Sequence, residues 1–244
     1  GSIGMVIAER ASLAGATGGC QAECGTAAGM AAAALVQMAG GNPEQVGHGM
    51  ALAIKNLLGL ACDPVVVLAN GFEEIEAITP IDVLRRADLD VAVAGVGSLD
   101  VTGAHGMVIR CDCEVSSVLA CDVCAVVLPG GMPGAVNLHQ NTAVNDLILS
   151  AFKAHSLVCA ICASPAVVLA PLGVLAGKRA VCYPGMETGD KDIGFEKGAS
   201  CVRDGNVVTA AGPGCAFDFA FEIARALCCD EVVKGLKESM VWGR

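Results

Sequence analysis

The strongest constraint on the fold of this chain is a series of short apolar runs rich in β-branched residues, most of them followed by a helical pattern. The runs begin at Pro64, where an Ala- and Gly-rich stretch ends. They are VVVLAN, DVAVAGV, CAVVLPGG, LVCAI, RAVCY and NVVTAAGPG. Short apolar strands separated by helices form a parallel sheet with helices on both faces. The sequence therefore predicts a doubly wound α/β domain over residues 65–244, with its active site at the carboxyl edge of the strands.

The first 64 residues have a different pattern, which predicts a small helical appendage. GTAAGMAAAALVQMAGG forms one expected helix, which Gly40 and Gly41 end. NPEQVGHGMALAIKNLLGL forms a second, with Asn42 as its N-cap and Pro43 in its first turn. Helices made mostly of small residues bury little apolar area, so we expect this segment to be marginally stable alone.

The charge and hydropathy of the chain exclude several classes of partner. It carries a net charge of -10 at pH 7, which argues against nucleic acid or an anionic membrane surface as the main partner. Glycines interrupt its apolar runs before they are long enough to span a membrane. The N-terminal residues lack a basic region followed by a long apolar region, so we expect no secretion signal and a cytoplasmic protein.

The cysteine content indicates a reducing compartment. The chain has 14 cysteines and no secretion signal, so most of them are expected to be small buried residues. Two CxxC pairs, Cys121 with Cys124 and Cys159 with Cys162, lie in or beside predicted strands. Positions i and i+3 of a strand point to opposite faces, which is poor geometry for a shared metal ion. We therefore expect no metal site at these cysteines, and we also expect no cofactor.

Cys162 differs from the other cysteines because it lies where the predicted strand LVCAI meets a helix that begins SPAVV. Ser164 is the expected N-cap, and Pro165 suits the first helical turn. A thiol there lies near unpaired backbone N–H groups and the positive end of the helix dipole, and both lower its pKa. The arrangement is that of a nucleophile elbow with cysteine in place of serine. An inert core cysteine is the alternative that stays open at this point.

Two further groups are candidates to act with Cys162. The LPGG turn, which ends in Gly130 and Gly131, offers backbone N–H groups to a developing oxyanion. Glu76 lies in an apolar part of its helix, where burial keeps a carboxyl protonated at neutral pH. A protonated acid beside a thiolate donates a hydrogen bond to it and moves protons. The apolar neighbours of Glu76 are Ile75, Ala77 and Ile78.

Glu73, Glu74 and most of the histidines are expected to lie on the surface. Glu73 and Glu74 open the same helix and fit solvated partners of the helix dipole. The histidines lie in the appendage or in polar surroundings, and none follows Cys162, so a Cys–His hydrolase has little support. The four histidines are His48, His105, His139 and His155.

The α/β domain contains four motifs, which follow one another along the chain in the order LANGFEEIEAITPIDVLRRA, VVLPGGMPGA, AICASPAVVLA and AAGPGCAFDFAFEIARAL. With them the chain resembles, from about Pro64 to Trp242, the DJ-one branch of the ThiJ/PfpI superfamily. The resemblance implies a flavodoxin-like sandwich that is usually a homodimer.

The resemblance also assigns roles to individual residues. The reactive cysteine matches Cys162, its partner glutamate matches Glu76, and the glycine oxyanion region matches Gly130 and Gly131, with Ala163 after the nucleophile. The protease-like relatives have a histidine where this chain has Ala163. Many close relatives have another histidine after the next strand, where this chain has Tyr183 and Pro184. Proton transfer is therefore left to Glu76.

The function that the resemblance implies falls into two classes. Family members are credited with glutathione-independent glyoxalase activity and protein deglycation, and also with chaperone action and redox sensing. As an enzyme, the protein would take small 2-oxoaldehydes such as methylglyoxal: Cys162 adds to the aldehyde, and Glu76 moves the proton between carbons. As a stress sensor, the alternative, Cys162 is oxidised to a sulfinate that Glu76 holds.

The appendage carries a second resemblance. ASLAGATGGCQAECGTAAGMAAAALVQMAGGNPEQ and ALAIKNLLGLACDP resemble an internal stretch of the α chain of iron–sulfur L-serine dehydratase. By this resemblance, Cys20 and Cys62 match two cluster ligands. The chain changes to VVVLANG directly after CDP, so the cluster site is incomplete. We interpret residues 1–64 as a truncated fusion remnant with vestigial ligands, and a dehydratase fragment is the remote alternative.

Overall fold

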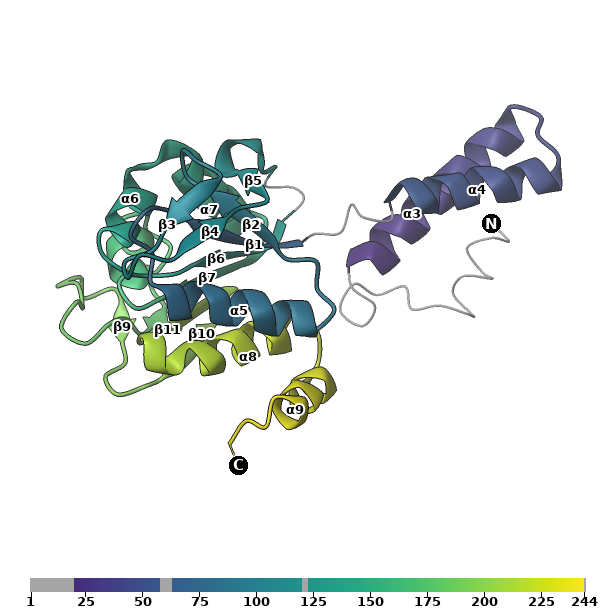
Figure 1. Ribbon diagram of the computed structural model, residues 1–244. Coiled ribbons are helices and arrows are strands. Elements are labelled where there is room, and N and C mark those ends of the chain that lie inside the picture. Colours follow the sequence, from purple (N-terminus) through teal and green to yellow (C-terminus); the bar gives the residue numbers. More distant parts are fainter. Residues whose placement is uncertain (1–19, 58–62, 120–122, 244) are drawn as a thin grey trace. The chain divides into compact units, whose positions relative to one another are not determined.

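The computed structural model describes residues 20–57, 63–119 and 123–243 (Figure 1). The chain divides into two compact units, Gly1–Cys62 and Asp63–Arg244. In the described part of the chain, no helix combines the length and the apolar composition needed to cross a membrane.

The first unit contains two helices that pack against each other, α3 (Cys20–Met38) and α4 (Pro43–Leu57). Asn42 caps α4, because its Oδ1 accepts the N–H of Gln45 at 2.9 Å and its own N–H donates to Gln45 Oε1 at 2.9 Å. Gly40 has a φ of 84°, which ends α3 in a left-handed turn. The two predicted helices and the Asn42 cap are confirmed.

Seven strands of the second unit form one sheet, in the order β10-β11-β7-β6-β1-β2-β5. They are β1 (Asp63–Leu68), β2 (Ala92–Gly95), β5 (Cys113–Glu114), β6 (Val123–Leu128), β7 (Leu157–Ile161), β10 (Cys201–Asp204) and β11 (Val207–Ala210). Neighbouring strands pair in parallel, except that β10 runs antiparallel to β11. The predicted doubly wound α/β fold is confirmed, with one antiparallel edge strand added.

Helices cover both faces of this sheet (Figure 1). Helices α5 and α8 pack together on one face, and α6 and α7 pack on the other. Because the central strands are buried on both sides, their sequences are continuous apolar runs without alternation. The helices are α5 (Glu74–Arg86), α6 (Gly134–Gln140), α7 (Thr142–Lys153), α8 (Ala216–Leu227) and α9 (Asp230–Ser239).

Two short strand pairs lie outside the main sheet. The antiparallel hairpin of β3 (Asp100–Thr102) and β4 (Val108–Arg110) was not predicted from the sequence. The predicted strand RAVCY is only partly right: its first two residues form β8 (Arg179–Ala180), which pairs in parallel with β9 (Gly194–Phe195) and not with the main sheet.

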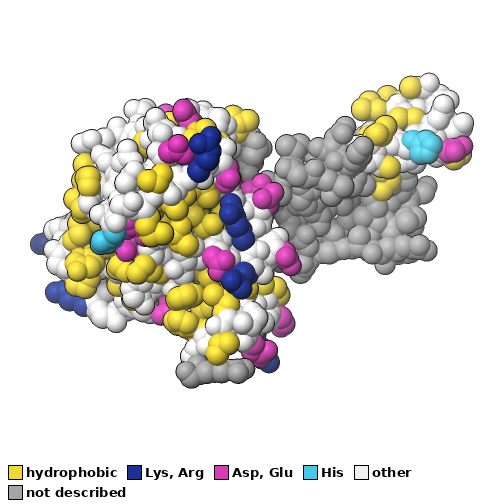
Figure 2. Space-filling view, in the orientation of Figure 1, with side chains coloured by type: hydrophobic (Ala, Val, Ile, Leu, Met, Phe, Trp, Pro, Cys, Tyr) yellow, Lys and Arg dark blue, Asp and Glu magenta, His cyan; other side chains and the backbone are white. Residues whose placement is uncertain are grey.

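The surface of the second unit mixes charges of both signs. On the face in view, Lys and Arg side chains are interspersed with acidic ones and with apolar patches (Figure 2). A nucleic-acid surface instead gathers basic side chains into a continuous stripe.

Candidate active site

The candidate site lies at the carboxyl edge of the central strands, as predicted. The adjacent strands β1, β6, β7 and β11 run in parallel, so the segments that follow them meet at one edge. The start of α5 follows β1, the Pro129–Gly131 turn follows β6, and Cys162 follows β7 directly. These three segments contribute the side chains and N–H groups described next.

Cys162 occupies a left-handed backbone conformation, with a φ of 63°. This region is strained for a residue other than glycine and persists only where the surroundings hold it. Here the Cys162 N–H donates to Ala210 O at 2.9 Å, and its carbonyl accepts the N–H of Tyr183 at 2.8 Å. The sharp strand-to-helix turn is the geometry of a nucleophile elbow.

Ser164 occupies the expected N-cap position, but its side chain does not cap the helix. Ser164 has helical backbone angles, and its hydroxyl donates to Pro129 O at 2.6 Å instead of capping the turn. The helix after it is a short π-helical segment, Pro165–Leu169, and not the longer helix expected. The Ser164 hydroxyl thereby ties the turn after β7 to the turn after β6 and holds Cys162 beside Gly130.

Glu76 is fully buried, and its carboxyl lies beside Cys162. Oε2 accepts the N–H of Gly130 at 2.8 Å. Oε1 is buried, and no described nitrogen or oxygen atom hydrogen-bonds to it, whereas a hydrogen bond between the carboxyl and the Cys162 thiol shifts the pKa of both groups. The carboxyl and the thiol therefore act on each other directly, and Oε1, which no other described group engages, is the oxygen placed to carry a proton.

The expectation that Ile75 and Ile78 bury Glu76 is wrong, because Ile75 is 52% exposed and Ile78 is 36% exposed. Glu76 instead lies on the inner side of α5, together with Ala77 and Pro80. Glu73 fixes the start of this helix, since its carboxylate accepts the N–H of Glu76 at 2.8 Å. The carboxyl is buried because Glu76 lies on the face of α5 that packs inward, and not because the residues beside it in the sequence are apolar.

Burial dominates the electrostatics of the pair. Burial, with a smaller contribution from the Glu73 charge, raises the pKa of Glu76 from 4.5 to about 7, against the opposing hydrogen bonds of Cys162 and Gly130. Burial, and then the Glu76 charge, raises the pKa of the Cys162 thiol to about 12. The lowered thiol pKa expected from the sequence is therefore wrong, and the pair together holds one proton between these two pH values.

Of the three backbone N–H groups expected to face the sulfur, those of Gly131 and Ala163 do so, but that of Gly130 does not. The N–H groups of Gly131 and Ala163 interact with the Cys162 thiol and oppose the rise of its pKa. The N–H of Gly130 is already engaged by Glu76, so it is not free for an oxyanion. Gly130 is required for space, because an added Cβ would lie 2.8 Å from the Cys162 Cβ and 2.8 Å from Glu76 Oε2.

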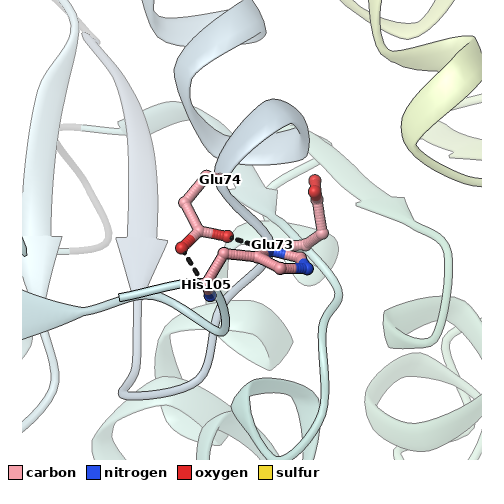
Figure 3. Close-up of side chains that lie close together, drawn as sticks. All are labelled: Glu73, Glu74 and His105. Atoms are coloured by element: carbon pink, nitrogen blue, oxygen red, sulfur yellow. Dashed lines mark hydrogen bonds and ion pairs between the residues drawn. The ribbon is translucent and has the colours of Figure 1, made fainter. Parts of the chain in front are cut away.

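Glu74 and His105 form a pair that the sequence did not indicate (Figure 3). Glu74 is buried, not solvated as expected, and its Oε2 lies 2.8 Å from His105 Nδ1. Its Oε1 accepts the backbone N–H groups of His105 at 2.7 Å and Met107 at 3.4 Å. His105 lies in the turn of the β3–β4 hairpin. Because that hairpin was not predicted, no sequence signal placed His105 beside α5.

Ligating atoms of Glu73, Glu74 and His105 lie within 4.8 Å of one another, the spacing that a metal ion requires. Both oxygens of Glu74, however, accept hydrogen bonds from the hairpin, and Glu73 caps α5. We therefore assign these carboxylates to holding the hairpin and the helix.

Of the remaining predicted residues, Tyr183 contacts the site through its backbone N–H alone, and the others lie away from it or outside the described residues. Cys159 is buried in β7, and Tyr183 packs beside Gly212, with its ring 3.4 Å from where a Gly212 Cβ would lie. Cys20 is the first residue of α3, whereas Cys62 and Cys121 lie outside the described residues.

Comparison with known proteins supports both resemblances noted in the sequence. Residues 65–226 match the DJ-1/PfpI family, and residues 1–71 match the serine dehydratase alpha chain family. The chain is 39% identical over 178 residues to Protein dj-1beta of Drosophila melanogaster, which covers 70% of this chain and 95% of that protein. The crystal structure of Drosophila DJ-1beta superposes with a TM-score of 0.71 at 36% identity, over 75% of this chain and 100% of that one.

The N-terminal match is more identical but shorter. The chain is 62% identical over 70 residues to a probable L-serine dehydratase alpha chain of Bacillus subtilis. This match covers 29% of the chain and 23% of that protein. The chain thus spans less than a quarter of the dehydratase relative.

Proposed function

Because the chain belongs to the DJ-1/PfpI family, whose model matches residues 65–226, we propose that it is a cysteine-dependent stress-response enzyme. It converts 2-oxoaldehydes such as methylglyoxal, or their adducts on proteins, into 2-hydroxy acids without glutathione. The observation that carries this proposal is the fully buried carboxyl of Glu76 beside the Cys162 thiol.

The pair supports the first step because it holds one proton at neutral and mildly alkaline pH. The reactive form is the one in which that proton lies on Glu76 Oε1 and the sulfur is a thiolate. The thiolate attacks the aldehyde carbon, and the N–H groups of Gly131 and Ala163, which contact the thiol, stabilise the oxyanion. Protonation of that oxygen gives a hemithioacetal.

The second step is a proton transfer for which Glu76 is suitably placed. Its carboxylate removes the proton from the carbon attached to sulfur and returns it to the neighbouring carbon, which converts the hemithioacetal into a thioester of the 2-hydroxy acid. A pKa of about 7 suits a group that must both accept and donate a proton near neutral pH. Water then cleaves the thioester, which releases the 2-hydroxy acid and restores the thiol.

Further parts of the proposal rest on family membership and on the sequence. We propose a homodimer in the cytoplasm, without metal or cofactor. We also propose two domains, residues 1–64 and 65–244, the first a truncated dehydratase-like fusion remnant.

Lactate formation from methylglyoxal in glutathione-free buffer tests the proposed activity. The wild type should form lactate, and Cys162→Ser should form none. Cys229→Ser is the matched control, because Cys229 is an exposed cysteine and its loss should leave the rate unchanged. Equal rates in the wild type and Cys162→Ser would refute a reaction at this cysteine.

Redox sensing is the second candidate, since a protonated Oε1 would also donate a hydrogen bond to an oxidised sulfur. Two equivalents of peroxide oxidise a thiol to a sulfinate with release of water. If peroxide adds two oxygen atoms to Cys162 selectively, and the wild type forms no lactate, the sensor function replaces the enzymatic one.

A further inference from the structure

The Glu74–His105 pair has the arrangement of an oriented acid–base group. Glu74 is buried, whereas the His105 side chain is 73% exposed. A buried carboxylate that accepts a hydrogen bond from Nδ1 fixes the neutral imidazole in one tautomer, with its proton on Nδ1. Nε2 is then the atom that accepts a proton, and Figure 3 shows this second ring nitrogen directed away from Glu74.

The pair lies next to the candidate site. Ligating atoms of His105 and Glu73 lie within 4.8 Å of each other. The backbone N–H of Glu73 donates to Gly130 O at 3.1 Å, and an added Cβ on Gly131 would lie 2.5 Å from this nitrogen. The Gly131 N–H in turn contacts the Cys162 thiol. Glu73 therefore links the two groups, since its side chain lies near the imidazole and its backbone contacts the glycine turn beside the reactive sulfur.

The hairpin that carries His105 is anchored to the same loop. Ala104 N–H donates to Phe72 O at 2.7 Å, and Gly71 N–H donates to Thr102 O at 2.8 Å. The loop before α5 is thus bonded to the hairpin on one side and to the Gly130–Gly134 turn on the other. Such bonding holds the imidazole at a fixed place beside the site.

The proposed reaction requires a base that Glu76 is poorly placed to supply. Glu76 is fully buried and moves the proton between carbons, whereas cleavage of the thioester needs a base in contact with solvent water. His105 is exposed and oriented by Glu74, and its hairpin is bonded to the loop that precedes α5.

We propose that His105, oriented by Glu74, is the general base for hydrolysis of the Cys162 thioester. Nε2 takes a proton from water as the water oxygen bonds to the thioester carbonyl carbon. The carbon–sulfur bond then breaks, the proton passes from the imidazolium to the thiolate, and the 2-hydroxy acid leaves. Glu74 acts as the positioning residue. This inference rests on the proposed function.

The pH dependence follows from the charges around the ring. The hydrogen bond and charge of Glu74, with a smaller contribution from Glu73, raise the pKa of His105 above 6.5. The charged residues of the hairpin strands, Asp100 and Arg110, pair with each other at 3.2 Å. A general base acts when unprotonated, so hydrolysis should accelerate as pH rises through a value above 6.5, and His105→Gln should lose this inflection.

Hydroxylamine trapping separates the two chemical steps, because hydroxylamine cleaves a thioester to a hydroxamate. In His105→Gln, the first turnover should form the thioester at the wild-type rate. Its hydrolysis should slow by about 100-fold, the lower range for loss of a general base, so close to one hydroxamate per chain should be trapped. Glu74→Gln should slow hydrolysis less. His155→Gln, at an exposed histidine, is the matched control and should match the wild type.

Each outcome decides between distinct alternatives. If His105→Gln releases lactate at the wild-type rate and no thioester is trapped, the role of His105 is overturned. The proposed function then still stands. Equal slowing of thioester formation and hydrolysis also overturns it, because that result indicates a structural role. A wild type that yields neither lactate nor hydroxamate contradicts the proposed function, and this inference with it.

Discussion

Glutamine in place of Glu76 should stabilise the folded protein at neutral pH. The folded state raises the pKa of this carboxyl from 4.5 to about 7, and each pKa unit corresponds to about 1.4 kcal/mol, so ionised Glu76 disfavours folding by about 3 kcal/mol. Glutamine fits the same space, its amide oxygen accepts the Gly130 N–H, and it carries no charge. The variant should therefore be more stable by about that amount, to within a factor of two.

The sign of the effect sets its pH range. Because the folded pKa lies above the unfolded one, the folded state binds this proton more tightly than the unfolded chain. The free energy of unfolding of the wild type therefore falls as pH rises from 4.5 to about 7. Above that pH, Glu76 causes no further loss. Glutamine does not titrate, so the difference between Glu76→Gln and the wild type should be small at pH 4.5 and full at pH 8.

Urea unfolding monitored by tryptophan fluorescence measures this difference for the second unit alone. Trp242 is the one tryptophan of the chain, and its ring packs against Phe217 and Phe221 at centroid distances of 4.8 and 5.7 Å. Glu231→Gln, at an exposed helix position, is the control and should show a small, nearly constant difference. A stability difference for Glu76→Gln that does not grow between pH 4.5 and 8 would refute the burial argument.

Three more predictions concern the site and the appendage. Although burial raises its pKa, Cys162 should be the cysteine that alkylates first at neutral pH, because Glu76 accepts its proton. Peptide mapping after brief treatment checks this, and earlier labelling of any other cysteine would count against the elbow. Gly130→Ala should cost about 1–3 kcal/mol of stability by overpacking and should abolish turnover, because its Cβ would lie 2.8 Å from the Cys162 Cβ. Gly189→Ala, where an added Cβ meets nothing within 4 Å, should do neither. Anaerobic reconstitution should yield no stable iron–sulfur cluster, and stoichiometric iron and sulfide that depend on Cys20 and Cys62 would contradict this.

The fold was largely predictable because its central strands are buried on both faces. Such strands are uninterrupted apolar runs, and glycine or proline marks their ends, as LPGG does after β6. The edge strand β10 and the β3–β4 hairpin are half exposed and short. Their sequences mix polar and apolar residues without a clear period, so they were missed.

The site was predictable at the level of residue types but not of contacts. The helix start and the strand end that carry Glu76 and Cys162 follow from local patterns. The direction of the thiol pKa does not, because it depends on burial and on a carboxyl 86 positions earlier in the chain. The Glu74–His105 pair depends on a hairpin packing against a helix, which no local pattern encodes.

Turnover by Glu76→Gln, measured together with alkylation of Cys162, tests the central claim most directly. Glutamine keeps the shape and hydrogen bonding of the side chain but transfers no proton. The variant should keep a readily alkylated Cys162 and lose methylglyoxal turnover by at least about 100-fold, with Glu76→Asp intermediate because its carboxyl is one methylene further away. Turnover at the wild-type rate in Glu76→Gln would contradict the assignment of Glu76 as the group that moves the proton.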